Sequence, residues 1–499
     1  MSTTESKSTL GLTQWLVIVV ASIGFLFDTY ELLMTPLVAP GAIAELLKVP
    51  QNNPLVTQWV GRLLWIAALC GGVFGLIGGW LTDKFGRKTV MAGSIFVYSF
   101  SPMLAAYSKT LPMFITFRCA TFVGVCVEFI AAITWLAEIF EDKRQREKWL
   151  GITQAFASLG GVFVTMVSAY VLAHLATFPS LGLPSGLGSS APASWRFLLL
   201  TGLLPAIPIA LLLPFVPESR IWKEKRAAGT LKRPSLGALF SPELRRVTLL
   251  TAALSACAYG IAFGALQVTV SRVAPGLPEL GEQAKALAPL RKQGEALNKE
   301  LNATTDPATR EELKAKIKAN FGQQKPINEQ VQKVSTHVQF FQEMGGLTGR
   351  IALALLLIVG IARRTLLKLF QFPAVIILPV TYFVLFKQGG DAFLWAYAAC
   401  GFLTVAQFSY FGEYLPKVFP LHLRGTGGGF ATNVGGRMIG TSASFLTTGV
   451  LAPMFAGSVE AVRPMHIAQA AGWLALGIAV LALVLGHFLP EPKTEALAG

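Results

Sequence analysis

Twelve apolar stretches of about 20 residues each constrain the fold of this chain more than any other feature, because that length spans a bilayer core of about 30 Å as a helix. The windows lie at roughly 14–34, 58–80, 89–107, 112–137, 150–174, 195–216, 247–269, 343–361, 370–387, 391–414, 426–452 and 467–489. Apolar residues make up 53% of the chain and charged residues 14%, whereas soluble domains carry about 25% charged residues. The sequence therefore predicts an all-α membrane protein with twelve transmembrane helices.

Lysine and arginine are concentrated in the loops that follow the even-numbered windows, above all between residues 220 and 246. The positive-inside rule places these loops on the cytoplasmic side. We therefore expect both termini in the cytoplasm and the chain in the cell (inner) membrane. The net charge of +15 is then a topogenic signal and does not require a nucleic-acid partner.

Residues 271–342 interrupt the apolar pattern on the outer side, with 11 basic and 8 acidic residues. Asp306 and Pro307 are typical of a helix start, and the segment is rich in Ala, Leu, Lys and Glu. We predict a helical hairpin inserted between the seventh and eighth helices. It is either a lid or partner-binding cap over the outer mouth, or a tolerated insertion in a surface loop.

An internal repeat is visible at long period. The tripeptide PES at 217–219 recurs as PEP at 490–492, and Glu138 and Glu413 are each followed 22 residues later by two glycines. Two pseudo-symmetric six-helix bundles account for both recurrences. The predicted units are an N-terminal bundle at 1–219, a cytoplasmic linker at 220–246 and a C-terminal bundle at 247–499 that contains the insert.

The most specific motif is GWLTDKFGRK at 79–88, between the second and third helices. It resembles the signature of the major facilitator superfamily in this loop, G-x-L-x-D-(R/K)-x-G-R-(R/K). The resemblance continues at Arg118, at PESRIW (217–222), at LRGTG (423–427) and in the PEPKTEAL tail that starts at 490. Such similarity implies a secondary transporter with a substrate site between its halves.

The same resemblance implies a gating network on the cytoplasmic side. Gly79 and Gly86 would let backbones approach closely, and Asp83 and Arg87 are spaced to form a pair. The alternative is a simple topogenic loop. The second half lacks an equivalent aspartate, so we expect its network to be degenerate. The predicted gating residues are Gly79, Asp83, Gly86, Arg87, Glu138, Arg146, Glu413 and Arg424.

Ionisable residues inside apolar windows are candidates for function, because each is costly to bury. At 1.5 Å per residue, Asp28 and Glu31 lie about 24 and 28 Å along the first helix, and Arg118 lies at a matching depth in the fourth. We predict that Arg118 pairs with Asp28 or Glu31 and that protonation of the acid releases the arginine. The segment DTYE resembles the D-x-x-D of metabolite and aromatic-acid symporters, which implies proton coupling. The alternative is that both acids lie at a hydrated helix end.

Glu128 is a further acid in the interior of the fourth helix, either a second proton site or a protonated packing residue. The deep arginines Arg118, Arg350 and Arg437 favour an anionic substrate, unless each satisfies a carboxylate on a neighbouring helix. Uncharged polar side chains on the same helices complete the predicted substrate site: Gln154, Tyr259, Gln267, Gln407 and Asn433.

The leading hypothesis is proton-coupled symport of a small organic anion by a monomer, with the bilayer, the substrate and protons as its partners. PESRIW and the tail favour a sugar or polyol symporter as the alternative. A membrane sensor that does not transport, and that uses the insert, is a further alternative from another class. The chain has neither the GxxxxGK[ST] motif of ATP-driven pumps nor HExxH, and its five cysteines show no CxxC spacing. We therefore expect no enzyme activity, no cofactor and no metal site.

Overall fold

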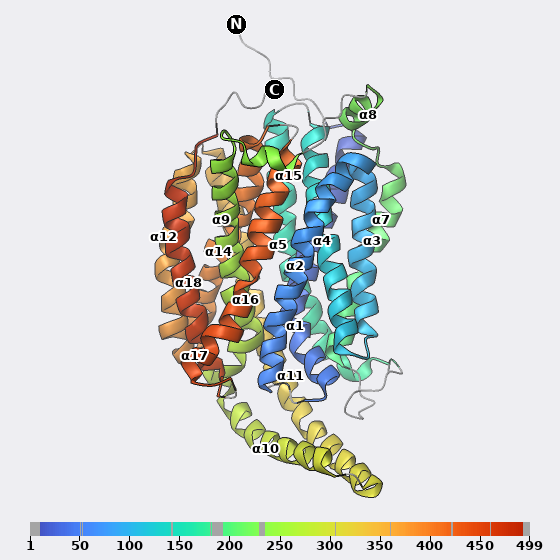
Figure 1. The fold of residues 1–499 in the computed structure, drawn as a ribbon, viewed down its shortest axis with the longest axis vertical. Helices are drawn as coiled ribbons and strands as arrows, with labels where there is room; N and C mark the ends of the chain where they lie inside the picture. The colour runs from blue at the N-terminus through green and yellow to red at the C-terminus, as the bar shows by residue number, and fades with distance from the viewer. Residues whose placement is uncertain are drawn as a thin grey trace.

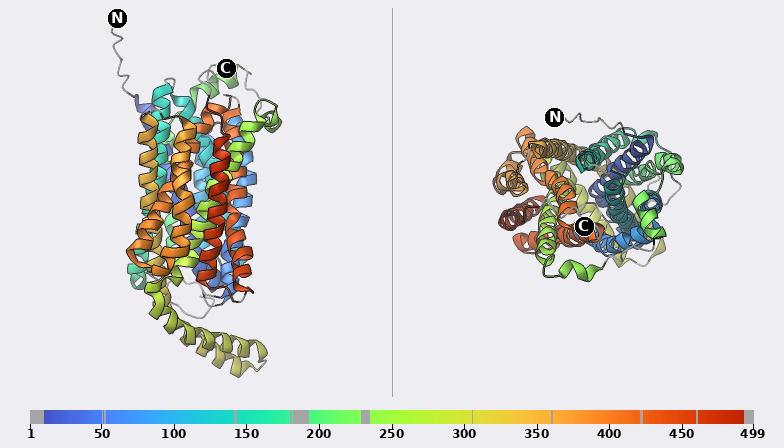
Figure 2. Two further views of the ribbon diagram at one scale, coloured as in Figure 1. Left: turned by 90° about the vertical axis from the view of Figure 1, so that its left-hand side faces the viewer. Right: turned by 90° about the horizontal axis from the view of Figure 1, so that it is seen from above.

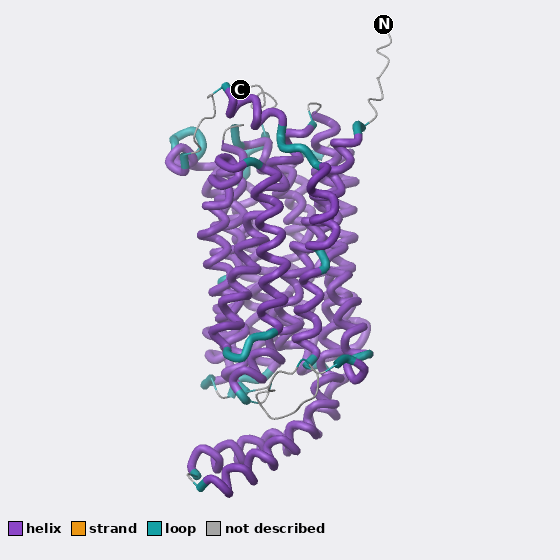
Figure 3. Tube along the Cα trace, turned by 90° about the vertical axis from the view of Figure 1, so that its right-hand side faces the viewer, coloured by secondary structure: helices purple, strands orange, loops and turns teal. Residues whose placement is uncertain are grey.

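The computed structural model is a bundle of long helices with a helical arm that projects from one end (Figure 1). It describes residues 10–49, 51, 53–140, 143–179, 181, 193–228, 235–304, 306–359, 361–420, 423–459 and 461–492. Over these residues the regular structure is helical throughout, with short connections and no strand (Figure 3).

Six membrane-spanning segments form the N-terminal half, and the first five are continuous helices. Their bounds are α1 (Leu12–Leu47), α2 (Pro54–Phe85), α3 (Arg87–Ala106), α4 (Leu111–Ile139) and α5 (Lys143–Ala173), followed by the short η1 (Leu175–Thr177). The sixth span is broken into α6 (Ser194–Leu200), η2 (Thr201–Leu203), α7 (Ala206–Leu212) and η3 (Leu213–Phe215). Pro205 and Pro214 have no backbone N–H to donate, which explains breaks in this span. The linker helices α8 (Arg220–Ala227) and η4 (Leu236–Phe240) follow.

The spans of the C-terminal half contain more π-helical turns. They are α9 (Arg245–Ile261) with η5 (Ala262–Leu266), η6 (Thr269–Val273) and η7 (Ala274–Gly276); the end of α11 (Pro307–Ile358); α12 (Arg363–Val380) with η9 (Thr381–Leu385) and α13 (Phe386–Gln388); α14 (Gly390–Val418); α15 (Arg424–Gly429) with η11 (Phe430–Gly440), α16 (Ala443–Phe445), η12 (Leu446–Leu451) and α17 (Ala452–Ala456); and α18 (Pro464–His487). Turns of π-helix widen a helix locally and are frequent at functional sites.

Eleven helical segments of the described chain are long and apolar enough to cross a membrane. The C-terminal part of α11, which packs against α14 and α5, is the twelfth segment of the bundle. The predicted all-α, twelve-span architecture is confirmed. The window at 14–34 had placed Asp28 and Glu31 near the outer end of the first helix. The helix runs to Leu47, however, so both acids lie near its middle.

The insert differs from the prediction in one respect. The first arm is η8 (Pro278–Leu280) with α10 (Gly281–Ala303), and the second arm is the N-terminal part of α11. Helix α11 continues without a break from the arm into the membrane, whereas the sequence windows predicted a separate hairpin and a separate eighth helix. The predicted helical hairpin is present, but its boundary with the eighth helix was misplaced, because the polar composition of the arm hides the continuity of the helix. Asp306 does cap α11, since its side chain accepts a hydrogen bond from the backbone N–H of Thr309 at 2.9 Å.

The two halves lie side by side and meet along two interfaces, α5 against α11 and α2 against η11 (Figure 2). Equivalent glycines serve equivalent contacts in each half. A Cβ on Gly160 of α5 would lie 1.8 Å from the carbonyl oxygen of Leu26 on α1, and one on Gly435 of η11 would lie 2.3 Å from that of Ala252 on α9. The fifth helix thus crosses the first as the eleventh crosses the seventh, as the repeat predicts.

Side-chain hydrogen bonds join the halves at the end of the bundle from which the arm projects, here called the insert end. The second arm and its continuation supply three of them: Gln332 Oε1 accepts from Ser194 Oγ at 3.1 Å, Thr336 Oγ1 lies 3.3 Å from Ser168 Oγ, and Gln339 Nε2 donates to Leu33 O at 3.0 Å. Arg272 at the end of the seventh span adds bonds to Gln51 O and Thr57 Oγ1. The halves are therefore held together at the insert end.

Candidate functional site

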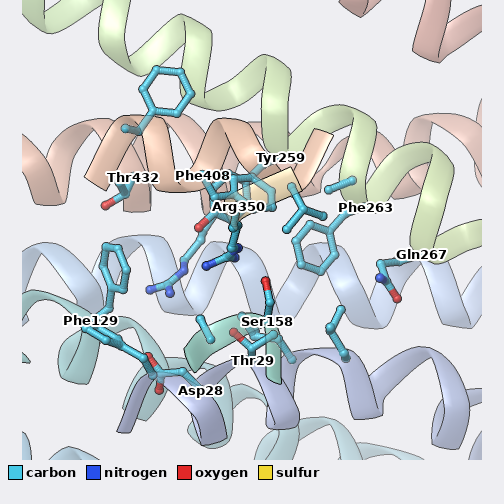
Figure 4. Close-up of a pocket in the computed structure, with 18 of the residues that line it drawn as sticks. Asp28, Thr29, Phe129, Ser158, Tyr259, Phe263, Gln267, Arg350, Phe408 and Thr432 are labelled. Atoms are coloured by element: carbon cyan, nitrogen blue, oxygen red, sulfur yellow. The ribbon is translucent and has the colours of Figure 1, made fainter. Parts of the chain in front are cut away.

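A cavity lies between the two halves, near the middle of the bundle (Figure 4). The N-terminal half supplies α1, α4 and α5 to its wall, and the C-terminal half supplies α9 with η5, α11, α14 and η11. The lining residues from the first half are Phe25, Asp28, Thr29, Leu32, Leu33, Phe129, Ala157 and Ser158. Those from the second half are Ser255, Tyr259, Ala262, Phe263, Gln267, Gln342, Glu343, Arg350, Val405, Phe408, Phe411, Thr432 and Arg437.

Four lining residues carry ionisable charges, and both signs are present. Asp28 belongs to the first half, and Glu343, Arg350 and Arg437 belong to the second. All four side chains belong to buried residues, with at most 8% of the residue surface exposed. Because buried charges are costly unless they are compensated, the cavity requires protons, internal partners or a charged ligand.

Asp28 faces Glu128, which belongs to α4. Their carboxyl groups lie within hydrogen-bonding reach of each other, and Glu128 is fully buried. None of the four carboxyl oxygens accepts a hydrogen bond from a donor among the described residues. Ionised carboxylates only accept hydrogen bonds, so this pair forms one only when one group carries a proton. The small residue Gly24 makes room for it, because a Cβ there would lie 2.2 Å from Glu128 Oε1.

Arg437 reaches from η11 to the helix that carries Glu128. Its guanidinium lies 5.1 Å from the ring centroid of Phe129, and it is within hydrogen-bonding reach of the Cys126 thiol. Its Nη1 also donates to Asn433 Oδ1 at 3.0 Å. Arg437 therefore brings a positive charge of the second half to the carboxyl pair of the first half.

Arg118 pairs with Glu31 and not with Asp28. Arg118 Nη1 lies 3.3 Å from Glu31 Oε2, and Nη2 donates to the Glu31 carbonyl at 2.9 Å and to Thr35 Oγ1 at 2.6 Å. Both side chains are almost fully buried. Neither lines the cavity, so the predicted role of Arg118 in substrate contact receives no support from its position. The alternative of a hydrated helix end is excluded for Asp28 and Glu31 by their burial.

Glu343 was missed by sequence reasoning. It lies on α11 and accepts a hydrogen bond from Gln342 Nε2 at 2.8 Å, while Tyr397 Oη donates to Gln342 Oε1 at 3.0 Å. The window at 343–361 placed it at a helix end, where an acid is unremarkable. The signal that could have found it is its spacing of seven residues from Arg350, which puts both on one face of a helix.

The other predicted substrate residues fall into three groups. Tyr259, Gln267, Arg350 and Arg437 line the cavity. Asn433 does not line it but positions Arg437, and Gln407 donates to Leu403 O of its own helix at 3.0 Å. The side chain of Gln154 lies outside those that the structure describes.

Three of the predicted gating residues of the first half, Gly86, Arg87 and Glu138, belong to a cluster at the end opposite the arm. Arg87 Nη2 donates to Glu138 Oε1 at 2.7 Å, and Ser219 Oγ donates to Glu138 Oε2 at 2.5 Å. Glu218 accepts the backbone N–H groups of Arg87 at 2.9 Å and Lys88 at 3.1 Å, so it caps α3. The PES motif thus anchors the loop between the second and third spans.

The second half repeats this cluster, which corrects the expectation of a degenerate network. Arg363 Nη2 lies 2.8 Å from Glu413 Oε1, and Lys417 also contacts Glu413. Glu491 accepts the backbone N–H groups of Arg363 at 3.1 Å and Arg364 at 2.9 Å. The second half lacks an equivalent of Asp83, but the arginine–glutamate part of its network is present.

Of the two motif glycines, only Gly86 is required by its surroundings. Its φ is +99°, and an added Cβ would lie 2.2 Å from Glu218 Oε2. Among the described residues a Cβ on Gly79 would meet nothing within 4 Å, so they give no support to a close backbone approach at Gly79. The side chains of Asp83, Arg146 and Arg424 lie outside the described part of the structure.

Comparison with known protein families agrees with the architecture of two six-helix halves around a central cavity. A family model described as Major Facilitator Superfamily matches residues 12–283, more than half of the chain. The chain belongs to the major facilitator superfamily. As a member of that family it is a multi-pass membrane protein and not an enzyme, as the sequence predicted.

Several curated transporters resemble this superfamily member over part of its length. The niacin transporter NiaP of Acinetobacter baylyi is 26% identical over 205 residues, which are 40% of this chain and 40% of the relative. The cis,cis-muconate transport protein of the same organism is 25% identical over 266 residues, or 51% and 57% of the two chains. The inner membrane metabolite transport protein YgcS of Escherichia coli is 30% identical over 181 residues, or 36% of each chain. Each of these matches spans less than two thirds of the relative.

Solved structures match almost the whole chain in fold. The xylose transporter XylE from E. coli, in a partially occluded inward open conformation, has a TM-score of 0.62 at 14% identity, with 96% of this chain and 100% of that chain covered. A D-xylose-proton symporter gives a TM-score of 0.61 at 17% identity, with 96% and 99% covered. Because the sequence identities are low, these similarities concern the fold alone. They confirm the predicted fold class.

Proposed function

We propose that the chain is a proton-coupled symporter that carries a small organic anion by alternating access of its two halves. The observation that carries the proposal is the buried Asp28–Glu128 carboxyl pair at the cavity, with the charge of Arg437 within electrostatic range of it. The acids belong to one half and the arginine to the other. A proton on the pair and an anion on the arginine would therefore act at the interface that must open and close.

The coupling follows from charge balance. With one shared proton, the pair carries a single negative charge that offsets the charge of Arg437. A second proton removes that charge and leaves Arg437 buried without compensation, which is costly in a medium of low dielectric constant. An anionic cargo restores the balance. Proton entry thus favours cargo binding, and loss of the proton favours release.

The walls of the cavity indicate what kind of anion fits. Phe25, Phe129, Phe263, Phe408 and Phe411 supply aromatic surface, and two arginines supply positive charge. This combination suits a carboxylate with an apolar or aromatic body. Niacin and cis,cis-muconate, which name two of the relatives, are compounds of this class. A sugar or polyol has no charge for these arginines to bind.

We assign the two arginine–glutamate clusters to gating. Arg87 with Glu138, and Arg363 with Glu413, fix the loops after the second and eighth spans at the same end of the bundle. Lysine and arginine dominate the loops at this end, so we place it in the cytoplasm of a cell whose inner membrane holds the protein. The transporter acts as a monomer, since one chain supplies the whole cavity wall.

Uptake into proteoliposomes with an imposed pH gradient tests the proposal. Labelled nicotinate, cis,cis-muconate, benzoate and xylose are offered in parallel, with a protonophore as the control. Accumulation of the carboxylates that stops with the protonophore supports the proposal. Uptake of xylose without the acids would favour the sugar symporter instead. If nothing accumulates and deletion of residues 281–303 alters a cellular response, the chain is a sensor.

A further inference from the structure

Glu343 is the one acid of the cavity that belongs to the same half as both arginines. It is 2% exposed. The proposed coupling through Asp28, Glu128 and Arg437 makes no use of it. Nothing in the sequence motifs assigns it a role either.

The hydrogen-bonding neighbours of Glu343 are uncharged, and its charged neighbour within electrostatic range is Arg350. Gln342 donates to its Oε1 at 2.8 Å, and the amide of Gln267 lies within hydrogen-bonding reach. Across the interface between the halves, Glu343 packs against Gly161 of α5, where an added Cβ would lie 2.1 Å from its Oε2.

Arg350 lies on the same face of α11, seven residues further along, and also lines the cavity. Figure 4 shows its side chain pointing into the space between α1 and α9. The two residues are about 10.5 Å apart along the helix axis, at 1.5 Å per residue. Together they place a carboxyl group and a guanidinium on one wall of the cavity, within electrostatic range of each other.

A wall of this kind recognises a ligand that has two different polar ends. The arginines bind a carboxylate, and Glu343 with its two glutamine neighbours can share a proton with a second group of the ligand. The aromatic side chains of the cavity would contact the part of the ligand between these two groups. If the second group of the cargo were another carboxylate, it would lie beside the carboxyl group of Glu343. Repulsion between the two negative charges would then weaken binding at this end.

We propose that Glu343 is a specificity residue that binds a nitrogen of the cargo, so that the preferred cargo is a carboxylate that also carries a nitrogen able to share a proton with a carboxyl group. The inference rests on the proposed organic-anion transport and narrows its cargo. The other charged or titratable groups that face this part of the cavity are Arg350, Arg437, Asp28 and Tyr259. Among these and Glu343, the acids are Glu343 and Asp28, and Asp28 is engaged with Glu128.

Nicotinate and benzoate provide a matched pair of probes, because they differ only in a ring nitrogen that replaces a C–H group. Uptake of each is measured in proteoliposomes under the same pH gradient. For the wild type we expect the half-saturating concentration of nicotinate to be about tenfold lower than that of benzoate. In Glu343→Ala the two values become equal, because nicotinate loses its partner while benzoate does not.

Two further variants make the result decisive. Glu343→Met keeps the approximate volume of the side chain without its hydrogen bonds, and it answers the same question if the alanine variant does not fold. Glu311→Gln removes an exposed acid of the arm and keeps the wild-type ratio. A tenfold preference that survives in Glu343→Met or Glu343→Ala overturns the inference. So does a wild type that takes up both acids equally by a proton-dependent route, and that result leaves the proposed function standing. A wild type that takes up cis,cis-muconate but neither of these acids also overturns the inference, and one that takes up none of the three carboxylates defeats the proposed organic-anion function itself.

Discussion

Arg118 of α4 holds Glu31 of α1 at two points, through the carboxylate at 3.3 Å and through the backbone carbonyl at 2.9 Å. The pair is almost fully buried and lies beside the cavity, outside its lining. It fixes the register of two helices of one half, whereas the pair Asp28–Glu128 interacts electrostatically with Arg437 of the other half. We therefore interpret Glu31–Arg118 as a brace within the N-terminal half.

Arg118→Ala should lower the stability of the folded protein by about 3–5 kcal/mol, because it leaves the Glu31 carboxylate buried without its partner. Glu31→Gln in the same chain should restore a large part of that loss, since an amide costs less to bury than a charge. Thermal unfolding in detergent measures the stability of Arg118→Ala, of Glu31→Gln and of the double variant. Together with the wild type, these complete a double-mutant cycle. A double variant no more stable than Arg118→Ala would contradict the interpretation as a brace.

Asp28→Asn and Glu128→Gln should each abolish accumulation driven by a pH gradient while exchange of cargo across the membrane persists. One pH unit is worth about 1.4 kcal/mol, or tenfold accumulation for one coupled proton. The accumulation ratio of both variants should fall to about one, because the carboxyl pair no longer gains and loses a proton in each cycle. Glu282→Gln, at an exposed acid of the arm, is the matched control. Retention of tenfold accumulation in both variants would place the proton site elsewhere.

The sequence was sufficient for the architecture and for the candidate charges other than Glu343. Twelve apolar windows and the repeated PES and PEP motifs predicted the two halves, and an acid inside an apolar run is conspicuous wherever it lies. It could not show which acid meets Arg118. Asp28 and Glu31 are three residues apart, nearly one helical turn, so the choice depends on how α1 is rotated against α4.

Glu343 and the continuity of α11 were missed by sequence reasoning for a different reason. The arm is polar because water surrounds it, and hydropathy windows register the boundary of the membrane, not the end of a helix. Helix α11 crosses this boundary without a break, and the hydropathy windows therefore divided it into two elements. Glu343 then fell at an apparent helix end, although the structure buries it against Gly161 of α5.

Gly86→Ala should destabilise the protein by about 1–2 kcal/mol, whereas Gly79→Ala should be neutral or slightly stabilising. Gly86 has a φ of +99° and abuts the carboxylate of Glu218, while Gly79 lies within α2 with open space around it. Thermal unfolding of the two variants distinguishes the glycine needed for backbone geometry from the one that is not. Equal effects of the two substitutions would be inconsistent with this structure.

The start of α11 should fray in acid. Hydrogen bonds from the Thr309 hydroxyl and backbone N–H hold the pKa of Asp306 below its ordinary value of 3.8. A lowered pKa stabilises the folded arm above that ordinary value, and the stabilisation is lost as the pH falls through the pKa of the folded state. Amide hydrogen exchange at residues 308–310 should show falling protection as the pH drops below 3.8. Asp306→Asn keeps a capping group without a titrating proton, so its protection should not depend on pH in this range.

A disulfide between Ser168→Cys and Thr336→Cys should trap the insert end closed. The two hydroxyl oxygens lie 3.3 Å apart, on α5 of one half and α11 of the other, so the cysteine pair is within reach of a disulfide. If the halves must separate at this end in every cycle, oxidation of the double variant should stop uptake and a reductant should restore it. Each single variant, which still has the five native cysteines, should keep its uptake under the same oxidant. Full uptake by a double variant that is shown to be cross-linked would mean that the bonds from α11 to α5 do not break during transport, and the second arm would then be a fixed part of the N-terminal half.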